Sequence, residues 1–172
     1  MPTTYQLIAS TEIGAGGVAS FNFNSIPQTY RDIQLFSSAR VTATSRTDGK
    51  FIFNSVTSAY QYIFYEGYAT NILYTSQSNG TAQVAVLMNQ SDATANYFST
   101  SIQYISNYTN TGYKQHIFRQ CDPFNSASDF YIQAGAGQMT GGSAGITSLT
   151  ISANVGNIAQ YSKFHLYGIS YT

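Results

Sequence analysis

Apolar residues alternate with polar ones along much of this chain, and this pattern limits its fold more narrowly than any other feature. The clearest runs lie in Ile33–Val41, Leu149–Ala153 and Phe164–Gly168. A strand that buries one face of an antiparallel sheet needs this alternation, because successive side chains point to opposite faces. No window of about eleven residues has the helical period. The sequence therefore predicts an all-β chain, with at most a single helical turn near Ser25–Gln28.

Further strands are expected where Tyr, Phe, Ile, Val and Thr dominate, since these residues fit a pleated surface. These segments are Tyr5–Ser10, Phe21–Phe23, Lys50–Asn54, Tyr60–Tyr65, Ala82–Met88, Tyr97–Ile105, Tyr113–Gln120 and Asp129–Ala134. Glycine-containing turns separate many of them, among them Asp48-Gly49 and Ser78-Asn79-Gly80. No linker or change of composition divides the chain. About ten short strands predict one domain, residues 1–172, folded as an antiparallel, jelly-roll-like β-sandwich.

Charged residues are scarce, and this bears on the partners the chain can bind. They make up 8% of the sequence, against about 25% in average domains. Seven basic and seven acidic residues cancel, so nucleic-acid binding is not expected. A nearly neutral surface repels its neighbours weakly, which suits a subunit packed against copies of itself or a larger assembly. The alternative is a secreted or environmental β-protein with a neutral surface.

The first ten residues, MPTTYQLIAS, lack the positive and apolar regions of a signal peptide. No apolar stretch approaches the roughly 18 residues of a membrane-spanning helix. We therefore expect synthesis in a cytoplasm and no membrane partner, while release without a signal, such as by lysis, leaves the final location open. Cys121 is alone, so neither an intrachain disulfide nor a cysteine metal site is expected.

Two catalytic patterns occur in the wrong context. Gly141–Gly145 matches G-x-S-x-G, but a strand follows it where the nucleophile elbow needs a helix. Gly14–Ala19 matches G-x-G-x-x-A, but the alternating Phe21–Phe23 segment follows, so a hairpin loop is predicted. His116 and His165 lack metal-ligand spacing and are interpreted as surface residues of a sheet. The sequence predicts no catalytic residue, no cofactor and no metal.

A glycan-degrading enzyme is the weakest functional hypothesis for this chain. It would need two carboxylates brought to about 5–10 Å by the fold. Most of the carboxylates look like turn or solvent-exposed residues. The seven candidates are Glu12, Asp32, Asp48, Glu66, Asp92, Asp122 and Asp129.

Tyrosine is abundant: there are 15 tyrosines and no tryptophan. Tyrosine supplies a large amphipathic contact area, which suits protein interfaces and also stacking against sugar rings. Alternatively, some tyrosines cap the sandwich core with their hydroxyls in water. The candidate interface residues fall in two crowded segments and are Tyr60, Tyr62, Tyr65, Tyr68, Tyr74, Tyr104, Tyr108 and Tyr113.

Both ends of the chain carry a family resemblance. At the start stand Tyr5–Ser10, Ile13–Gly17 and Phe21–Tyr30, and at the end Ala159–Ser162 and Leu166–Ile169. Together they resemble small virion proteins of tailed bacteriophages, and the middle of the chain carries no match. The resemblance covers strands and turns without a functional motif.

The resemblance implies a β-sandwich that assembles as a trimer, either on a capsid surface as a cement or decoration protein or at the tip of a tail fibre. We therefore expect a homotrimer in the virion that binds the major capsid protein or another virion protein through edge strands and tyrosine-rich loops. The alternative is a tail-fibre or receptor-binding module that recognises a host glycan.

Overall fold

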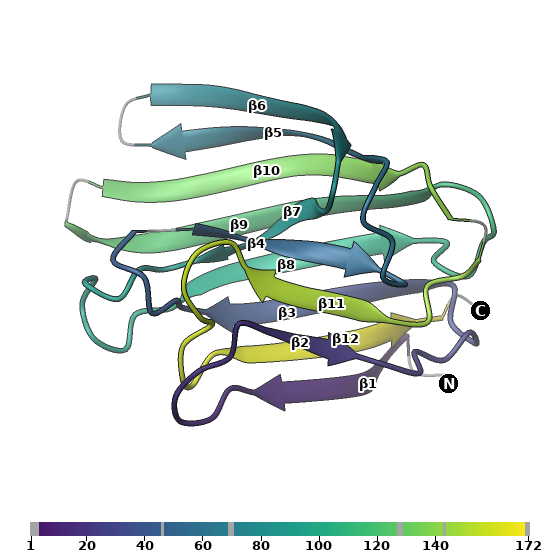
Figure 1. Ribbon diagram of the computed structural model, residues 1–172, viewed down its shortest axis with the longest axis horizontal. Helices are drawn as coiled ribbons and strands as arrows, with labels where there is room; N and C mark the ends of the chain where they lie inside the picture. Colours follow the sequence, from purple (N-terminus) through teal and green to yellow (C-terminus); the bar gives the residue numbers. More distant parts are fainter. Residues whose placement is uncertain (1–3, 46, 69–70, 127–128, 143, 171–172) are drawn as a thin grey trace.

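Twelve β-strands and no helix occur in the computed structural model, which describes residues 4–45, 47–68, 71–126, 129–142 and 144–170 (Figure 1). In chain order the strands are β1 (Tyr5–Glu12), β2 (Ser20–Phe23), β3 (Asp32–Ala39), β4 (Thr47–Phe53), β5 (Tyr60–Tyr68), β6 (Asn71–Gly80), β7 (Gln83–Met88), β8 (Ser99–Ser106), β9 (Lys114–Ser126), β10 (Asp129–Met139), β11 (Leu149–Ala153) and β12 (Lys163–Ile169).

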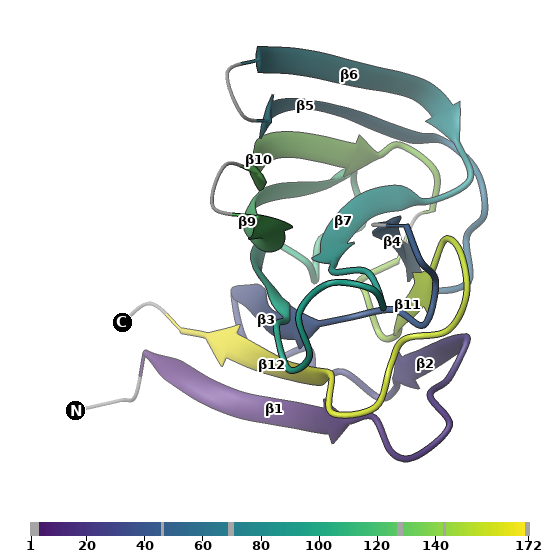
Figure 2. The ribbon, with the colours of Figure 1, turned by 90° about the vertical axis from the view of Figure 1, so that its left-hand side faces the viewer.

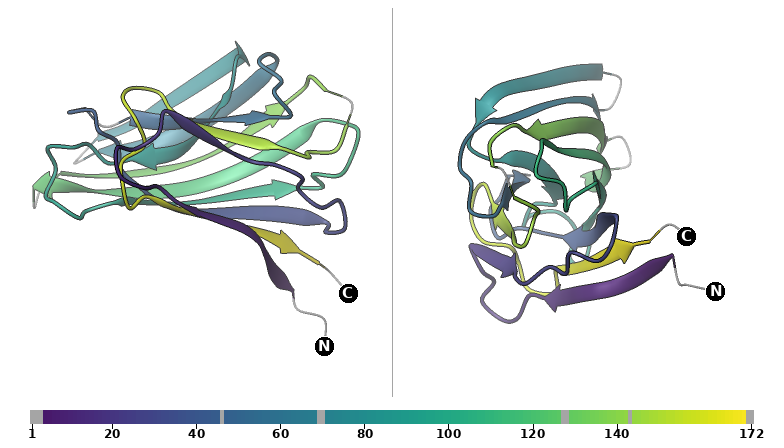
Figure 3. Two further views of the ribbon diagram at one scale, coloured as in Figure 1. Left: turned by 60° about the horizontal axis from the view of Figure 1, so that its bottom comes forward. Right: turned by 90° about the vertical axis from the view of Figure 1, so that its right-hand side faces the viewer.

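The strands form two antiparallel sheets that lie face to face (Figures 2 and 3). The larger sheet has eight strands in the order β1-β12-β3-β8-β9-β10-β5-β6. The smaller has four, in the order β2-β11-β4-β7. The predicted all-β antiparallel sandwich is therefore confirmed, with twelve strands instead of about ten.

Most connections carry the chain from one sheet to the other. Among the described strands, only the consecutive pairs β5–β6, β8–β9 and β9–β10 are neighbours in one sheet. The loop after β1, in which Gly16 and Gly17 have positive φ, thus leads into the opposite sheet. The prediction of a hairpin there was wrong, because a glycine turn fixes the local bend and not the partner of the next strand.

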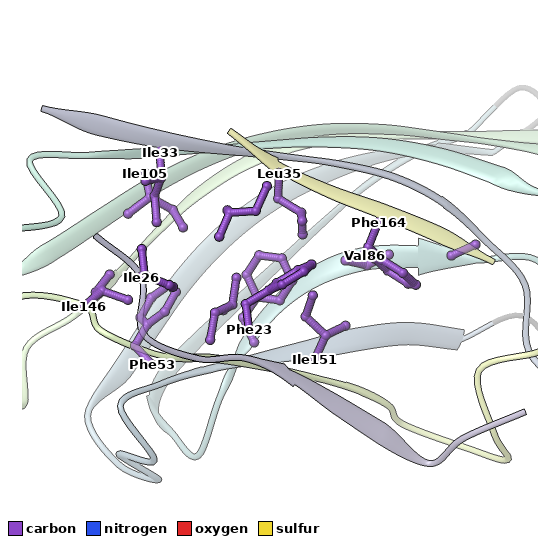
Figure 4. Close-up of a cluster of buried hydrophobic side chains, with 14 of the residues drawn as sticks. Phe23, Ile26, Ile33, Leu35, Phe53, Val86, Ile105, Ile146, Ile151 and Phe164 are labelled. Atoms are coloured by element: carbon purple, nitrogen blue, oxygen red, sulfur yellow. The ribbon is translucent and has the colours of Figure 1, made fainter. Parts of the chain in front are cut away.

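The core lies between the two sheets and is built by the alternating positions of the sequence. Ile33, Leu35 and Phe164 point from the larger sheet toward Phe23 and Ile151 of the smaller one (Figure 4). These side chains are almost completely buried, and each contributes about 1.5–3 kcal/mol relative to an exposed position. The predicted inward faces of β3, β11 and β12 are confirmed.

Three strands, β4, β6 and β10, differ from the sequence-based expectation. β4 begins at Thr47, so Asp48-Gly49 lies within a strand and not in a turn. Gly49 packs directly beneath the Met88 side chain and backbone atoms of its neighbours, where a Cβ would not fit. β6 had no counterpart in the prediction, because its sequence does not alternate. The predicted turn at its end is present only as the positive φ of Asn79.

The sequence predicted that a strand ends at Ala134, before a glycine-rich segment, yet β10 continues to Met139. Gly135 and Gly137 belong to this extension, and the space of their missing side chains is occupied by Phe64 and Gln83. Close approach of a neighbouring strand at Gly135 and of the opposite sheet at Gly137 explains these glycines better than turn formation does. Ser143 of the G-x-S-x-G match lies outside the described residues.

The expected helical turn at Ser25–Gln28 is absent from the described residues. Ser25 has a positive φ of 54°, and Ile26 inserts into the core. The amide of Gln28 donates hydrogen bonds to the carbonyls of Ile26 and Ile146 at 3.0 and 2.8 Å. The segment is an irregular link held by these bonds.

Candidate binding face

The smaller sheet covers one side of the larger sheet and leaves the other side open (Figure 2). Strand register aligns the uncovered side chains in rows across all eight strands. We call the following positions the open face. The first row is Leu7, Tyr167, Gln34, Tyr104, Ile117, Ala136, Ile63 and Ser76. The second is Ser10, His165, Phe36, Ile102, Arg119, Ala134, Tyr65 and Tyr74. The third is Glu12, Lys163, Ser38, Thr100, Cys121, Ile132, Gly67 and Ile72.

Charge is almost absent from the open face. Glu12 and Lys163 form an ion pair at 3.3 Å at the β1 end, and Arg119 is the one other Asp, Glu, Lys or Arg residue among its positions. Large apolar side chains are exposed instead: Ile117 at 54% and Tyr65 at 60% are examples. Contiguous exposed apolar surface of this kind is typical of an interaction site.

Two hollows lie on the open face: one extends from Tyr5 across β3, β8 and β9 to β10, and the other lies near the β1 edge. The larger encloses about 620 Å³ and is lined by, among others, Tyr5, Gln34, Tyr104, Ile117 and Arg119. The smaller encloses about 410 Å³ between Tyr5, Phe36, His165 and Tyr167. Among the described residues, no carboxylate lines either hollow. The hollows therefore offer aromatic surface, the Gln34 amide, the Arg119 guanidinium and the His165 imidazole.

The aromatic side chains of the smaller hollow hold one another in place. Tyr167 meets Phe36 edge-on with ring centroids 5.6 Å apart, and it meets Tyr5 at 6.5 Å. Such edge-to-face pairs contribute about 0.5–1.5 kcal/mol beyond their area burial. The three rings come from β1, β3 and β12, which are adjacent in the sheet, so the surface is preformed.

Tyr104 is fixed from below by a buried carboxylate. Its hydroxyl donates a hydrogen bond to Oδ2 of Asp32, while the Asn107 backbone N–H donates to Oδ1 at 2.7 Å. Asp32 was interpreted as a turn or solvated residue, but it is only 3% exposed. That interpretation was wrong, because the carboxylate accepts bonds from β8 and the loop that follows it.

Three of the eight tyrosines selected from the sequence lie on the open face, namely Tyr65, Tyr74 and Tyr104. Tyr113 is 65% exposed between β8 and β9, away from these rows. Tyr62 and Tyr68 lie on the opposite side of β5. Tyr68 is stacked on Tyr131 there, with ring centroids 4.4 Å apart.

Tyr60 and Tyr108 were wrongly selected as interface residues, because both are fully buried. The Tyr60 hydroxyl accepts a hydrogen bond from the Phe53 backbone N–H at 2.8 Å, and burial raises its pKa to about 12. The Tyr108 hydroxyl donates to the Pro27 carbonyl. Both residues therefore belong to the core.

Sequence reasoning missed much of the open face, including Tyr5, Phe36, Ile117 and Tyr167. A signal was present in part: Phe36 and Tyr167 alternate with buried residues, so they had to face the other way. Large apolar residues gathered on the solvent-facing positions of neighbouring strands indicate a contact surface. Abundance of tyrosine alone did not carry that information.

A polar layer lies on the opposite, inward side of β8, β9, β10 and β5. The Gln120 amide donates to the Gln133 side chain, which in turn donates to Glu66. Gln83 of β7 donates to the Gln138 carbonyl at 2.7 Å and to the Gln61 carbonyl at 3.1 Å. These bonds tie the small sheet to the large one where the apolar core ends.

His116 lies in this layer and is 2% exposed, so the prediction of a surface histidine was wrong. Its ring is stacked on Phe118 with centroids 5.5 Å apart and faces Phe51 at 6.5 Å. Neither ring nitrogen makes a hydrogen bond of normal geometry. Burial lowers the pKa of His116 to about 4, and the nearby Gly137 backbone offsets that only in part. The imidazole is therefore neutral at pH 7.

Within the described ranges, no three His, Cys, Asp or Glu side chains are grouped so that they could hold a metal ion. In the same residues, no helix is long and apolar enough to cross a membrane.

Comparison with known proteins adds little to this geometry. No family model matches the chain, and no curated protein matches it. Among solved structures, the crystal structure of the galectin LEC-6 from Caenorhabditis elegans aligns over 94% of this chain and 96% of the galectin, at 11% identity and a TM-score of 0.32. A likeness of this size carries no argument about function.

Proposed function

We propose that this protein is a structural protein of a tailed-phage virion that binds the assembled capsid shell through the open face. The observation that carries the proposal is the uncovered, nearly uncharged side of the eight-stranded sheet. The phage assignment rests on the resemblance at the two ends of the chain, and the assembly role rests on this face.

The dimensions of the open face suit a protein partner. Eight strands spaced about 4.8 Å and three rows spaced about 7 Å cover roughly 38 by 21 Å. A standard protein interface buries about 800 Å² on each partner, so the open face alone is nearly sufficient. The simplest partner of this size is the major capsid protein.

The mechanism is mass action. A protein that binds the assembled shell and not the free shell protein stabilises the shell by the difference in binding free energy. Because the open face holds a single charged residue apart from the Glu12–Lys163 pair, the attraction is mainly apolar. Binding should therefore persist when the salt concentration is raised. A trimeric arrangement on the shell stays a prediction from the resemblance.

Co-sedimentation with purified shells tests the proposal, with copy number per virion as the accompanying measurement. Ile117→Glu places a charge at the centre of the open face, and we expect it to weaken shell binding by about 10- to 100-fold, since an apolar contact is replaced by a desolvated carboxylate. Val155→Glu is the matched control, because Val155 is 50% exposed outside the open face.

Equal loss of binding in both variants would contradict the role of the open face. Absence of the protein from purified virions would contradict the proposal as a whole. Many copies in proportion to the shell lattice would favour decoration, whereas a few copies would favour a tail fibre.

The larger hollow favours a second candidate, a receptor-binding module that recognises a host glycan. Tyr5 and Tyr104 offer ring surfaces for a sugar, and Gln34 and Arg119 offer hydrogen bonds to its hydroxyls. Binding of the isolated protein to a glycan array, lost in Tyr104→Ala and kept in Val155→Glu, would support this function over the first.

A further inference from the structure

Strand β6 ends the eight-stranded sheet and pairs with β5 alone. The β5–β6 hairpin extends beyond the last strand of the smaller sheet (Figure 2). Consequently β6 is exposed on both faces, from Asn71 through Asn79, with Ile72 at 80% and Tyr74 at 67%. Its outer edge presents backbone N–H and C=O groups that no described strand of this chain pairs.

The other sheet edges are short, charged or irregular along the part that could pair, whereas β6 is regular from Asn71 to Gln77 and shifts register against β5 only beyond Gln77. β1 has a bulge between Leu7 and Ala9 and carries the Glu12–Lys163 ion pair. β2 has only four residues, and β7 has six with a register shift against β4. Bulges, charges and short length are the devices by which proteins prevent edge pairing. β6 has ten residues, none charged and none proline.

We infer that two copies of this chain pair through their β6 strands, antiparallel about a two-fold axis, to form one continuous sheet. Another β-strand offers the complementary row of backbone donors and acceptors, so the partner of this edge is a strand. A second copy fits this role because self-pairing of an uncharged strand brings no like charges together. A two-fold contact also closes on itself and leaves no β6 edge unpaired.

The side chains fit this arrangement. A two-fold axis perpendicular to the sheet keeps every side chain on its own side, and one residue at the axis then faces its own copy. Pairing along the whole of β6 places this residue at the middle of the strand, at Thr75 or Ser76. With Thr75 at the axis, Tyr74 lies opposite Ser76 and Ile72 lies opposite Ser78. Each large apolar residue of the open face then meets a small one, and no bulky pair collides.

Pairing of this kind joins the open faces of two copies on the same side. A dimer then presents two binding faces to a repeating lattice, which raises its overall affinity without new contacts. The pairing itself does not depend on the proposed function. It predicts a two-fold dimer of the isolated protein, whereas the resemblance predicts a trimer, and the experiment below distinguishes the two.

Sedimentation equilibrium of the isolated protein over a range of concentrations tests the inference. We expect a reversible dimer of twice the 18.8 kDa chain mass. Ser76→Lys places two ammonium groups close to the axis and should raise the dimer dissociation constant at least about tenfold. Ser10→Lys is the matched control, because Ser10 is exposed on the open face at the opposite edge strand, and it should leave the constant unchanged.

Hydrogen exchange of the wild-type protein supplies a measurement free of substitutions. Within residues 71–80, the amides that point away from β5, about every second one, should become protected as the concentration rises through the dimer range, while those of β1 should not change. A monomer at all concentrations, a trimer, or a dimer equally sensitive to both lysine variants would overturn the inference. None of these results bears on shell co-sedimentation, so failure of the pairing and failure of the proposed function are distinguishable.

Discussion

Acidification from pH 7 to pH 4 should destabilise this fold through His116. The pKa of the buried imidazole is about 4, whereas a histidine in the unfolded chain has a pKa near 6.5. Between these values the unfolded state binds a proton that the folded state does not. Stability therefore falls as the pH drops below about 6.5, and the loss is nearly complete at about pH 4.

The size of this effect follows from the difference between the two pKa values. About 2.5 pH units at about 1.4 kcal/mol each give roughly 3–4 kcal/mol. Urea unfolding at pH 7, 6, 5 and 4.5, followed by circular dichroism, measures the slope. Carboxylates also titrate toward the lower end, so the contribution of His116 is the difference between the wild type and His116→Leu.

His116→Leu should remove that part of the slope and leave the stability at pH 7 unchanged or higher. Both ring nitrogens are desolvated without a normal hydrogen bond, and a buried unpaired polar atom costs about 1–3 kcal/mol. A leucine of similar volume carries no such cost. The reasoning is refuted if the variant keeps the wild-type slope between pH 6.5 and 4.5, or if it is strongly destabilised at pH 7.

Two further substitutions test the packing. Tyr60→Phe removes the hydroxyl that accepts the Phe53 N–H and should lower the free energy of unfolding by about 1–3 kcal/mol, measured by denaturant titration; an unchanged midpoint would mean that the bond contributes nothing. Gly135→Ala puts a methyl group into space held by Phe64 and should cost about 1–3 kcal/mol. Gly112→Ala, with nothing closer than 3.7 Å, is its control, and equal melting temperatures for the two alanine variants would contradict the overlap.

The sequence predicted the sandwich and its inward faces because the same alternating apolar residues determine both the strands and the side that is buried. At Ile33, Leu35, Leu149 and Ile151 the apolar side chain fixes which face is buried, and the polar neighbours confirm it. Where that contrast is missing, the prediction fails. The segment Asn71–Gly80 does not alternate because neither face of β6 is buried, so no local signal marked it as a strand.

The candidate site was harder to predict than the fold. Tyr60 and Tyr65 stand in one strand, yet the first is fully buried and the second is 60% exposed. Local sequence does not distinguish them, because their burial is decided by which strands the chain later places on each side. The polar inward face around Gln133 and His116 escaped prediction for the same reason: both faces of β9 and β10 mix polar and apolar residues.

The repeated crossing of the chain between the two sheets has a consequence for how the protein folds. Apart from β5–β6 and the run from β8 to β10, no described strand can pair with the next one along the chain. Most pairings must therefore wait until distant segments meet, and a chain dominated by such contacts loses much entropy before it gains any. We expect folding on the millisecond-to-second scale typical of β-sandwiches. The three-stranded meander β8–β9–β10 is the one sizeable unit able to form early and act as a template for the rest.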